Sequence, residues 1–252
     1  MKSRTCALGA AFASLVATSA PGTAQAGDGD YPLVYGQRPL VLTKGLQQVE
    51  GAFGFLRPDV AGADLAVSVL GSYEIGITDE ITAGVIAVPL GISPEVNYGQ
   101  PVAYATLRLA DAEAYDLGIR GRLTFPGPEG GDVGIAFGLA GRFQIHKAAW
   151  VDAGALVDVT LSDPAVTTLE VPLNLGVSLT RQLFFTLDTS LKVPEADFDV
   201  ASVSSFAGLG YTVGVESPRL DLYLRAGLPH IAFQEPVSYD TQIQIGGRYF
   251  FR

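Results

Sequence analysis

Residues 133–145 read V-G-I-A-F-G-L-A-G-R-F-Q-I. Apart from Gly141, the odd positions of this stretch hold large apolar side chains, and the even positions hold Gly, Ala, Arg and Gln. Successive side chains of a β-strand point to opposite sides, so an alternation of period two predicts a strand with one apolar face and one small or polar face. Residues 115–125 and 65–77 repeat the pattern.

Segments of this kind run along the whole chain after residue 45, and no stretch has the period of a long amphipathic helix. They are residues 46–56, 65–77, 81–91, 102–109, 115–125, 133–145, 149–161, 167–179, 183–191, 205–215, 220–228 and 239–251. The connections alternate between two kinds. Short turns fall at 78–80, 111–113, 146–147, 180–182 and 216–219. Longer Pro-, Gly- and Asp-rich loops fall at 57–64, 92–101, 126–132, 162–166, 192–204 and 229–238.

Tight turns on one side and longer loops on the other are typical of bacterial outer-membrane barrels. We therefore predict an all-β fold, a single transmembrane antiparallel up-and-down β-barrel of about 12 strands, within a range of about 10 to 14. The alternative is a secreted β-sandwich, whose second face would be rich in Lys, Glu, Thr and Gln. Here that face holds Gly, Ala and Ser with scattered charges. Pro89 and Pro172 fall inside predicted strands, where proline removes a hydrogen bond between strands.

The composition of the 252 residues limits the classes of protein to consider. Apolar residues make up 48% and charged residues 17%, which excludes an intrinsically disordered chain. The formal net charge is -10 and only four residues are lysines, so no basic stripe is available for a nucleic acid.

The first 26 residues form a separate segment. Lys2 and Arg4 precede an apolar run that ends in Ala24-Gln25-Ala26, a small-x-small cleavage pattern. We predict a signal peptide over residues 1–26, cleaved after Ala26, and a barrel domain over residues 27–252. Cys6 is the only cysteine, so the mature chain would have no disulfide.

The C-terminal residues 242–252 read Q-I-Q-I-G-G-R-Y-F-F-R. This alternation, ending on Tyr249 and Phe251, resembles the C-terminal strand of Gram-negative outer-membrane β-barrel proteins, although Arg252 follows the last aromatic residue. The resemblance implies insertion into the cell outer membrane by the barrel-insertion machinery. With twelve strands, both termini of the chain would lie on the side of the tight turns, which in such barrels is the periplasm. The hairpin over residues 73–84 resembles those of outer-membrane transporters of the aromatic-degradation type.

Charged residues on the small or polar face would point into the barrel. They are Arg108, Arg120, Arg122, Arg142, Arg225, Arg248, Glu50, Glu74, Asp116, Asp158, Glu170, Asp188 and Asp221. A charge inside a barrel requires water or a partner. These side chains therefore form either a polar conduit that selects solutes or a core of paired arginines and carboxylates. All except Arg108 and Glu170 are our candidates for lumen selectivity, and Arg120, Arg122 and Arg142 would form a basic strip facing Glu74 and Asp188.

The long loops are acidic. They hold Asp59, Asp64, Glu95, Glu129, Asp132, Asp163, Glu195, Asp197, Asp199 and Glu235 against Arg57 and Lys192. Three interpretations remain open: cation focusing at a pore mouth, Ca²⁺ or Mg²⁺ bridging to outer-membrane lipopolysaccharide phosphates, and a solvated repulsive surface.

No nucleophile-elbow, phosphate-loop or zinc-protease motif is present. His146 in a short turn and His230 in a long loop would lie at opposite ends of the barrel, so a shared metal site is not expected. We predict a narrow passive channel for small polar solutes, with no cofactor and no enzymatic activity. The alternatives are a closed structural barrel and a lipid-modifying enzyme that uses His230. Because the loops are short, we expect any gate to be made by lumen side chains.

Overall fold

The computed structural model describes residue 35 and residues 38–59, 62–87, 90–112, 114–213, 220–232 and 238–252. These residues form one antiparallel sheet of fifteen strands. No helix among them is long and apolar enough to cross a membrane, and the 3-10 turn η2 (Phe198–Val200) joins two strands. The predicted signal peptide lies outside the described residues.

Twelve of the fifteen strands form a ring. They are β1 (Gln47–Arg57), β2 (Ala66–Gly76), β3 (Ile81–Ile86), β6 (Val102–Ala112), β7 (Tyr115–Thr124), β8 (Gly134–His146), β9 (Ala149–Thr160), β10 (Val166–Ser178), β11 (Leu183–Pro194), β12 (Ser202–Val213), β13 (Leu220–Ala232) and β15 (Thr241–Phe251). The three short strands are β4 (Leu90–Ser93), β5 (Asn97–Tyr98) and β14 (Ser238–Tyr239). Each of the twelve predicted segments corresponds to one strand of the ring.

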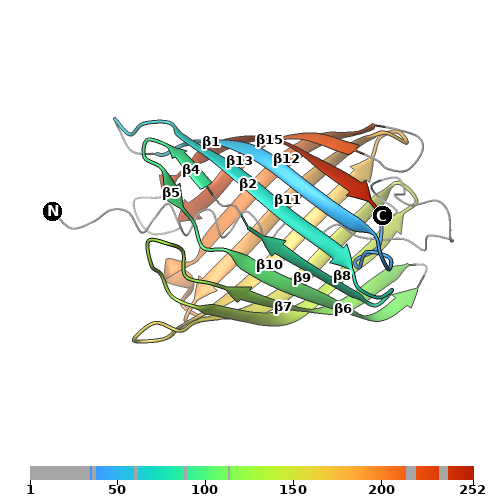
Figure 1. Cartoon of the computed structure of the whole chain (residues 1–252), viewed down its shortest axis with the longest axis horizontal. Helices are drawn as coiled ribbons and strands as arrows, with labels where there is room; N and C mark the ends of the chain where they lie inside the picture. Colours follow the sequence, from blue (N-terminus) through green and yellow to red (C-terminus); the bar gives the residue numbers. More distant parts are fainter. Residues whose placement is uncertain are drawn as a thin grey trace.

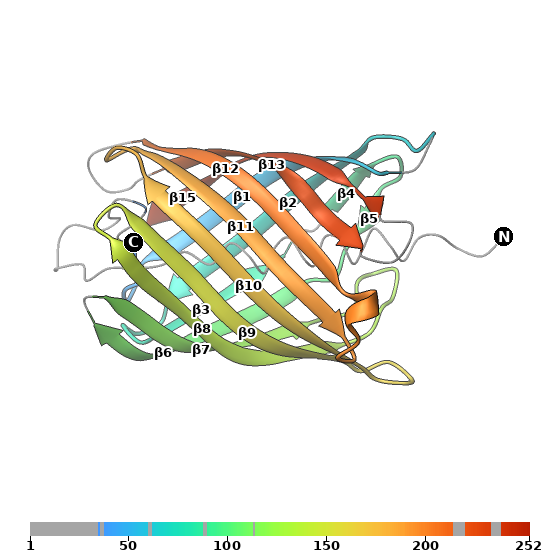
Figure 2. The same cartoon turned by 180° about the vertical axis from the view of Figure 1, so that it is seen from behind.

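Strand β1 closes the ring because it pairs with β2 on one side and with β15 on the other. Gly51, at the middle of β1, stands opposite both Gly71 and Gly247. The slanted strands surround the lumen in both views of the molecule (Figures 1 and 2). A closed ring leaves no free strand edge. The predicted up-and-down barrel is therefore confirmed, and the sandwich alternative is excluded.

The two ends of the barrel differ in their connections. At the end that holds Arg252, here called the tight-turn end, the described links between strands are two to four residues long. At the opposite, long-loop end lie the longer connections, which include β4, β5, β14 and η2. The predicted turn at 216–219 lies outside the described residues.

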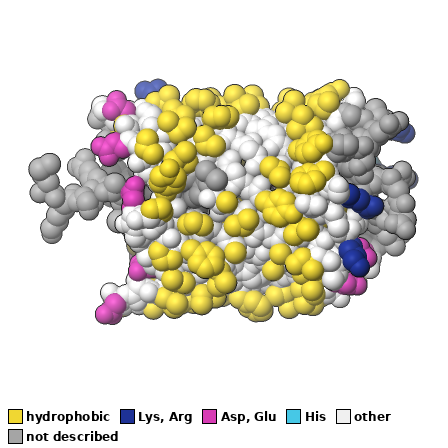
Figure 3. Space-filling view, viewed as in Figure 1, with side chains coloured by type: hydrophobic (Ala, Val, Ile, Leu, Met, Phe, Trp, Pro, Cys, Tyr) yellow, Lys and Arg dark blue, Asp and Glu magenta, His cyan; other side chains and the backbone are white. Residues whose placement is uncertain are grey.

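The side chains are distributed in the opposite sense to those of a water-soluble protein. On β8, Phe137 and Leu139 point outward and are each 61% exposed, whereas Arg142 points inward and is 1% exposed. Apolar side chains cover the outside between the two ends (Figure 3). An apolar outside and a polar inside match a barrel surrounded by lipid.

The sheet departs from regular pairing in its third strand and at Pro172. The third strand is interrupted: β3 ends at Ile86, and β4 continues the pairing with β2 from Leu90, while Pro89 lies outside the described residues. Pro172 sits inside β10, opposite Ser190 of β11. On its other side, the pairing with β9 is absent between Glu170 and Leu173, because proline has no N–H to donate.

Some strand ends differ from the prediction. Strand β13 extends to Ala232, past an irregularity in its pairing with β12 that lies between Leu228, opposite Ser205, and Ile231, opposite Val203. His230 therefore belongs to a strand, and its placement in a loop was wrong. Strand β11 extends to Pro194, which brings Lys192 into the barrel wall. In both cases strand pairing continues across residues whose Pro-, Asp- and Glu-rich surroundings suggested a loop.

Candidate functional site

The candidates for lumen selectivity lie on the inner side of the barrel wall. Eight of the eleven selectivity candidates have buried side chains: Glu50, Glu74, Asp116, Arg142, Asp188, Asp221, Arg225 and Arg248. Arg120, Arg122 and Asp158 are half-buried. All eleven point inward because they occupy the polar positions of the alternating strands, so their common location follows from the strand pattern.

Arg122 is the centre of a cluster at the long-loop half of the lumen. Its Nη2 atom lies 2.6 Å from a carboxylate oxygen of Asp158 and 2.9 Å from one of Glu170. The Nζ atom of Lys192 lies 4.0 Å from the other oxygen of Glu170. Lys192 was expected in an outer loop, and this contact places it in the lumen.

Arg142 on β8, the strand next to that of Arg122, is paired with Asp152 on β9. The Nη2 atom of Arg142 donates to Asp152 over 2.6 Å, and Nε donates to the second carboxylate oxygen, so the contact is bidentate. The guanidinium also lies 5.2 Å from the ring centre of Trp150. Asp152 was not among the predicted lumen residues, although its even position on β9 places it on the same face as Asp158.

Two further pairs lie on the β11 to β15 side of the wall. Arg248 donates to Glu50 over 3.1 Å, and the hydroxyl of Tyr223 donates to the same carboxylate over 2.6 Å. Arg225 lies 3.7 Å from Asp188. Asp188 therefore has its own arginine and does not face the predicted basic strip.

Glu74 and Arg120 differ from these pairs. Among the described residues neither forms an ion pair within 4.0 Å. The Nε atom of Arg120 donates to the Thr106 hydroxyl over 3.1 Å, and Glu74 accepts a hydrogen bond from the Gln48 amide over 3.0 Å. The predicted strip is thus divided: Arg122 and Arg142 form ion pairs with carboxylates of other strands, whereas Arg120 interacts with Glu74 and Asp152 at a distance beyond 4.0 Å.

A chain segment before β1 occupies the tight-turn end of the lumen. We call residues 38–46 the inner segment. Its main chain is bound to the barrel wall: the Leu40 N–H donates to Asp116 over 3.0 Å, the Leu42 N–H donates to the Thr82 hydroxyl over 2.7 Å, and the Gly45 N–H donates to the Gly76 carbonyl over 2.8 Å.

Side chains of the inner segment are buried against the wall. Arg38 is fully buried and forms a bidentate pair with Asp221, with an Nη2–Oδ1 distance of 2.8 Å. Leu42 and Leu46 pack with Phe250. Asp221 also accepts a hydrogen bond from Thr212 over 2.8 Å, so this carboxylate has partners on both sides.

Tyr35, which precedes the inner segment, packs against aromatic side chains of the barrel wall. The ring of Tyr35 stacks on Phe184 with centroids 4.0 Å apart and lies 5.4 Å from the ring of Trp150. The guanidinium of Arg38 lies over the rings of Tyr35 and Phe250. The expectation that lumen side chains alone form any gate was wrong, because main chain from outside the strands crosses this end of the lumen.

The two histidines lie toward opposite ends of the barrel, in β8 and β13. The Nδ1 atom of His146 accepts a hydrogen bond from the Ala148 N–H over 3.2 Å. The side chain of His230 is exposed, and within the described part of the chain its imidazole has no hydrogen-bonding serine. The described residues contain no group of three or more His, Cys, Asp or Glu side chains arranged to hold a metal ion.

The outer surfaces of the two ends differ in charge. On the face seen in Figure 3, the charged side chains at the left edge, the long-loop end, are mostly acidic, whereas the right edge carries basic side chains with acidic ones beside them. Of the predicted acidic loop residues, Glu235 lies outside the described residues. Arg57 is exposed on the last position of β1 and belongs to the outside of the wall.

The closed ring and its apolar outer wall define a class of fold, that of the transmembrane β-barrels of the outer-membrane type. Among solved structures, the chain is similar to the NanC porin, with a TM-score of 0.62 and 9% sequence identity over 79% of this chain and 98% of that one. It is similar to the KdgM porin, with a TM-score of 0.56 and 11% identity over 81% and 99% of the chains. The COG4313 outer membrane channel from Pseudomonas putida F1 matches with a TM-score of 0.58 and 13% identity over 90% and 99%.

No protein-family model matches the chain, and no curated protein sequence matches it. At these identities the solved structures show a shared barrel fold. What passes through this lumen is argued below from the chain's own residues.

Proposed function

We propose that the chain is a narrow passive channel of the outer membrane for small polar solutes. The observation that supports this most strongly is the closed ring with an apolar outside and a lumen lined by charged side chains. Such a wall is stable in lipid, and its interior suits water and ions. The similar fold of the porins and channels agrees with this function.

The orientation of the barrel in the membrane follows from the rule for outer-membrane barrels. In outer-membrane barrels the short turns face the periplasm and the longer loops face outward. The inner segment would then narrow the periplasmic mouth, and the acidic loops would surround the outer mouth. Cleavage after Ala26 and recognition of β15 by the insertion machinery remain predictions that fit this orientation.

Arg120 is the residue we assign to solute selection. Among the described residues, its guanidinium has one hydrogen bond, to Thr106, and no ion pair within 4.0 Å, whereas the other lumen arginines have carboxylate partners within that distance. Glu74 and Asp152 interact with it from farther away. An arginine without a carboxylate partner can bind a passing anion through its remaining N–H groups. Glu74, which has no cationic partner within the same distance, would provide the complementary site for a cation.

The closed structural barrel is the second candidate, and the inner segment favours it. Ion pairs and hydrogen bonds satisfy most lumen charges, and main chain crosses one mouth. Under this alternative the charged lumen would act as the polar core of a barrel that stabilises the membrane.

Single-channel recording separates the two candidates. The mature chain, residues 27–252, is refolded and added to a planar bilayer with a salt gradient across it. A channel gives discrete current steps and a reversal potential that reports its charge preference. A silent bilayer would overturn the channel proposal if the heat-dependent gel mobility of the same sample shows a folded barrel.

A further inference from the structure

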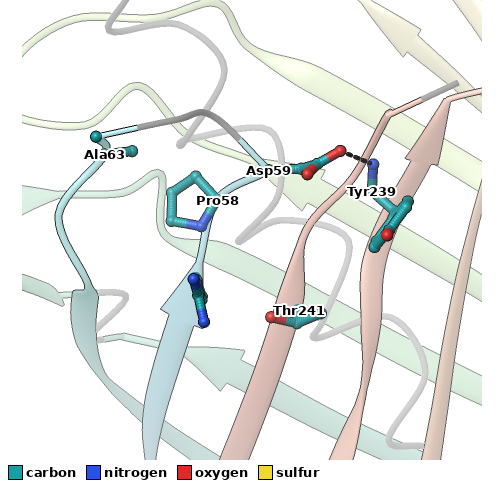
Figure 4. Close-up of a pocket in the computed structure, with 7 residues that line it drawn as sticks. Pro58, Asp59, Ala63, Tyr239 and Thr241 are labelled. Carbon is teal, nitrogen blue, oxygen red and sulfur yellow. Dashed lines mark hydrogen bonds between the residues drawn. The ribbon is translucent and has the colours of Figure 1, made fainter. Parts of the chain in front are cut away.

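A pocket lies on the outer surface of the barrel at the long-loop end. Its volume is about 450 Å³, and its lining residues are Arg57, Pro58, Asp59, Gly62, Ala63, Tyr239 and Thr241. Figure 4 shows Pro58, Asp59 and Ala63 on one side of it and Tyr239 and Thr241 on the other. The pocket thus opens between the end of β1 and the start of β15, which pair at Arg57 and Thr241.

Hydrogen bonds from main-chain N–H groups to side-chain carboxylates connect the two loops around the pocket. The Tyr239 N–H donates to the Asp59 carboxylate over 3.4 Å, the bond drawn in Figure 4. The Asp59 N–H donates to the Asp240 carboxylate over 3.0 Å. Both carboxylates are therefore held by backbone donors, and neither forms an ion pair with Arg57.

Arg57 provides the positive charge of the pocket. Within the described residues of the long-loop end, it is the one cation whose side chain faces away from the lumen, since Lys192 points inward to Glu170. A guanidinium offers planar pairs of N–H donors that match the oxygen atoms of a phosphate group.

The wall below the pocket is apolar. On β1 the outward residues that precede Arg57 are Phe55 and Phe53, which are 37% and 55% exposed. On β15 the outward residues that follow Thr241 are Ile243 and Ile245, 49% and 54% exposed. Arg57 is two residues from Phe55, a rise of about 7 Å along a strand, so it stands at the boundary between the apolar band and the polar rim.

We propose that this pocket binds the phosphate group of an anionic lipid of the outer leaflet, with lipopolysaccharide as the lipid. The phosphate would contact Arg57, and the acyl chains would run over Phe55 and Ile243. The inference rests on the outer-membrane location proposed above and is independent of whether the lumen conducts. It differs from divalent-cation bridging by the acidic loops, because the contact is a direct one between guanidinium and phosphate.

The test measures lipid binding to the purified mature protein in detergent. The probe is bisphosphorylated lipid A, and the number bound per barrel is read by native mass spectrometry. We expect Arg57→Gln to weaken binding about tenfold, which corresponds to about 1.4 kcal/mol. The matched control is Arg181→Gln, which removes an exposed arginine from the tight turn between β10 and β11 and should bind like the unchanged protein.

A second variant distinguishes direct phosphate binding from binding through a bridging cation, because the two predict opposite changes in lipid affinity. Asp59→Asn keeps an acceptor for the Tyr239 N–H and removes a negative charge beside the phosphate, so direct binding should strengthen about twofold to threefold. If Asp59→Asn and EDTA both weaken binding while Arg57→Gln does not, a bridging cation holds the lipid and the proposal is overturned. Equal binding by Arg57→Gln and Arg181→Gln would overturn it too.

Two chemical controls test the lipid itself. Lipid A without phosphate groups should bind no better to the unchanged protein than to Arg57→Gln. Inorganic phosphate should displace bisphosphorylated lipid A only weakly, because it lacks the acyl chains that contact the wall. Complete displacement at equal concentration would identify a simple anion site and reject the lipid as its occupant. Conductance of the same samples is recorded separately, so that failure of the channel proposal is recognised independently.

Discussion

The two halves of the lumen are built on the same strand pattern and are filled differently. At the tight-turn end, Arg38 and Asp221 have exposed side-chain fractions of 0% and 1%, and aromatic rings surround the pair. At the long-loop end, Asp158 and Lys192 remain 21% and 23% exposed. The inner segment covers Arg38 and Asp221, whereas at the long-loop end wall side chains bury Glu170 and leave its partners partly exposed. Polar lining alone therefore does not decide whether a barrel is open.

The largest effect on conductance is expected from removing the inner segment. A mature chain that begins after Thr43 lacks Arg38 and most of the inner segment, so the tight-turn mouth should resemble the long-loop mouth. We expect a several-fold increase in single-channel conductance, measured in planar bilayers. A folded, truncated barrel with the conductance of the full mature chain would show that the inner segment does not limit the current.

A single substitution can displace the inner segment without shortening the chain. A Cβ atom at Gly76 would lie 2.2 Å from the Thr43 carbonyl oxygen and 2.6 Å from that of Leu42, so Gly76→Val requires this main chain to move. We expect larger or more frequent current steps. Gly51→Val is the matched control, because a Cβ atom there meets nothing within 4 Å. Equal recordings for both variants would count against the prediction.

The ion pairs of the long-loop half allow a finer comparison between two neighbouring arginines. Arg122→Ala leaves Asp158 and the buried Glu170 without their arginine, so we expect a loss of about 3 kcal/mol in unfolding free energy. Arg120→Ala removes a residue with no ion pair and should change stability little. Each should shift the reversal potential in a salt gradient toward cation selectivity, because each removes a positive charge from the lumen.

Stability is measured by urea-induced unfolding of the refolded barrels. If the double variant Arg120→Ala/Arg122→Ala keeps the reversal potential of the unchanged protein, these residues do not select ions. If Arg120→Ala alone destabilises the barrel as much as Arg122→Ala, the description of Arg120 as an arginine without an ion pair is wrong.

The smallest effect is expected outside the lumen, at His230. Its exposed imidazole has no hydrogen-bonding serine within the described residues, so His230→Ala should leave the outer-membrane lipid profile unchanged, as measured by mass spectrometry of extracted lipids. A changed profile would support the lipid-modifying alternative and would require a partner for His230.

The position of each strand could be predicted from the sequence because successive side chains of a strand face lipid and lumen in turn, which gives the sequence a period of two. The same rule places Glu50, Arg142 and Asp221 inside the barrel. It would also have placed Asp152 there, since this residue shares the even positions of β9 with Asp158. The continuation of β13 through His230 escaped prediction because a bulge near Ser205 shifts the pairing where the local composition suggests a loop.

The partners of the inward charges could not be predicted in this way. Ion pairing depends on distances between residues that are far apart in the sequence, such as the 198 positions that separate Glu50 from Arg248. The register of neighbouring strands and the path of the inner segment set those distances. Residues 38–46 lack the alternation of a strand, and nothing in their order indicates that Arg38 reaches Asp221.

The class of fold, the membrane-facing surface and the inventory of lumen charges are thus properties of local sequence order, because each strand exposes alternate residues to lipid and to the interior. The closure of the ring, the pairing of most lumen arginines with carboxylates and the filling of one mouth are properties of the folded chain. They depend on contacts between distant segments, and the energy of a buried charge depends on which partner those contacts bring to it.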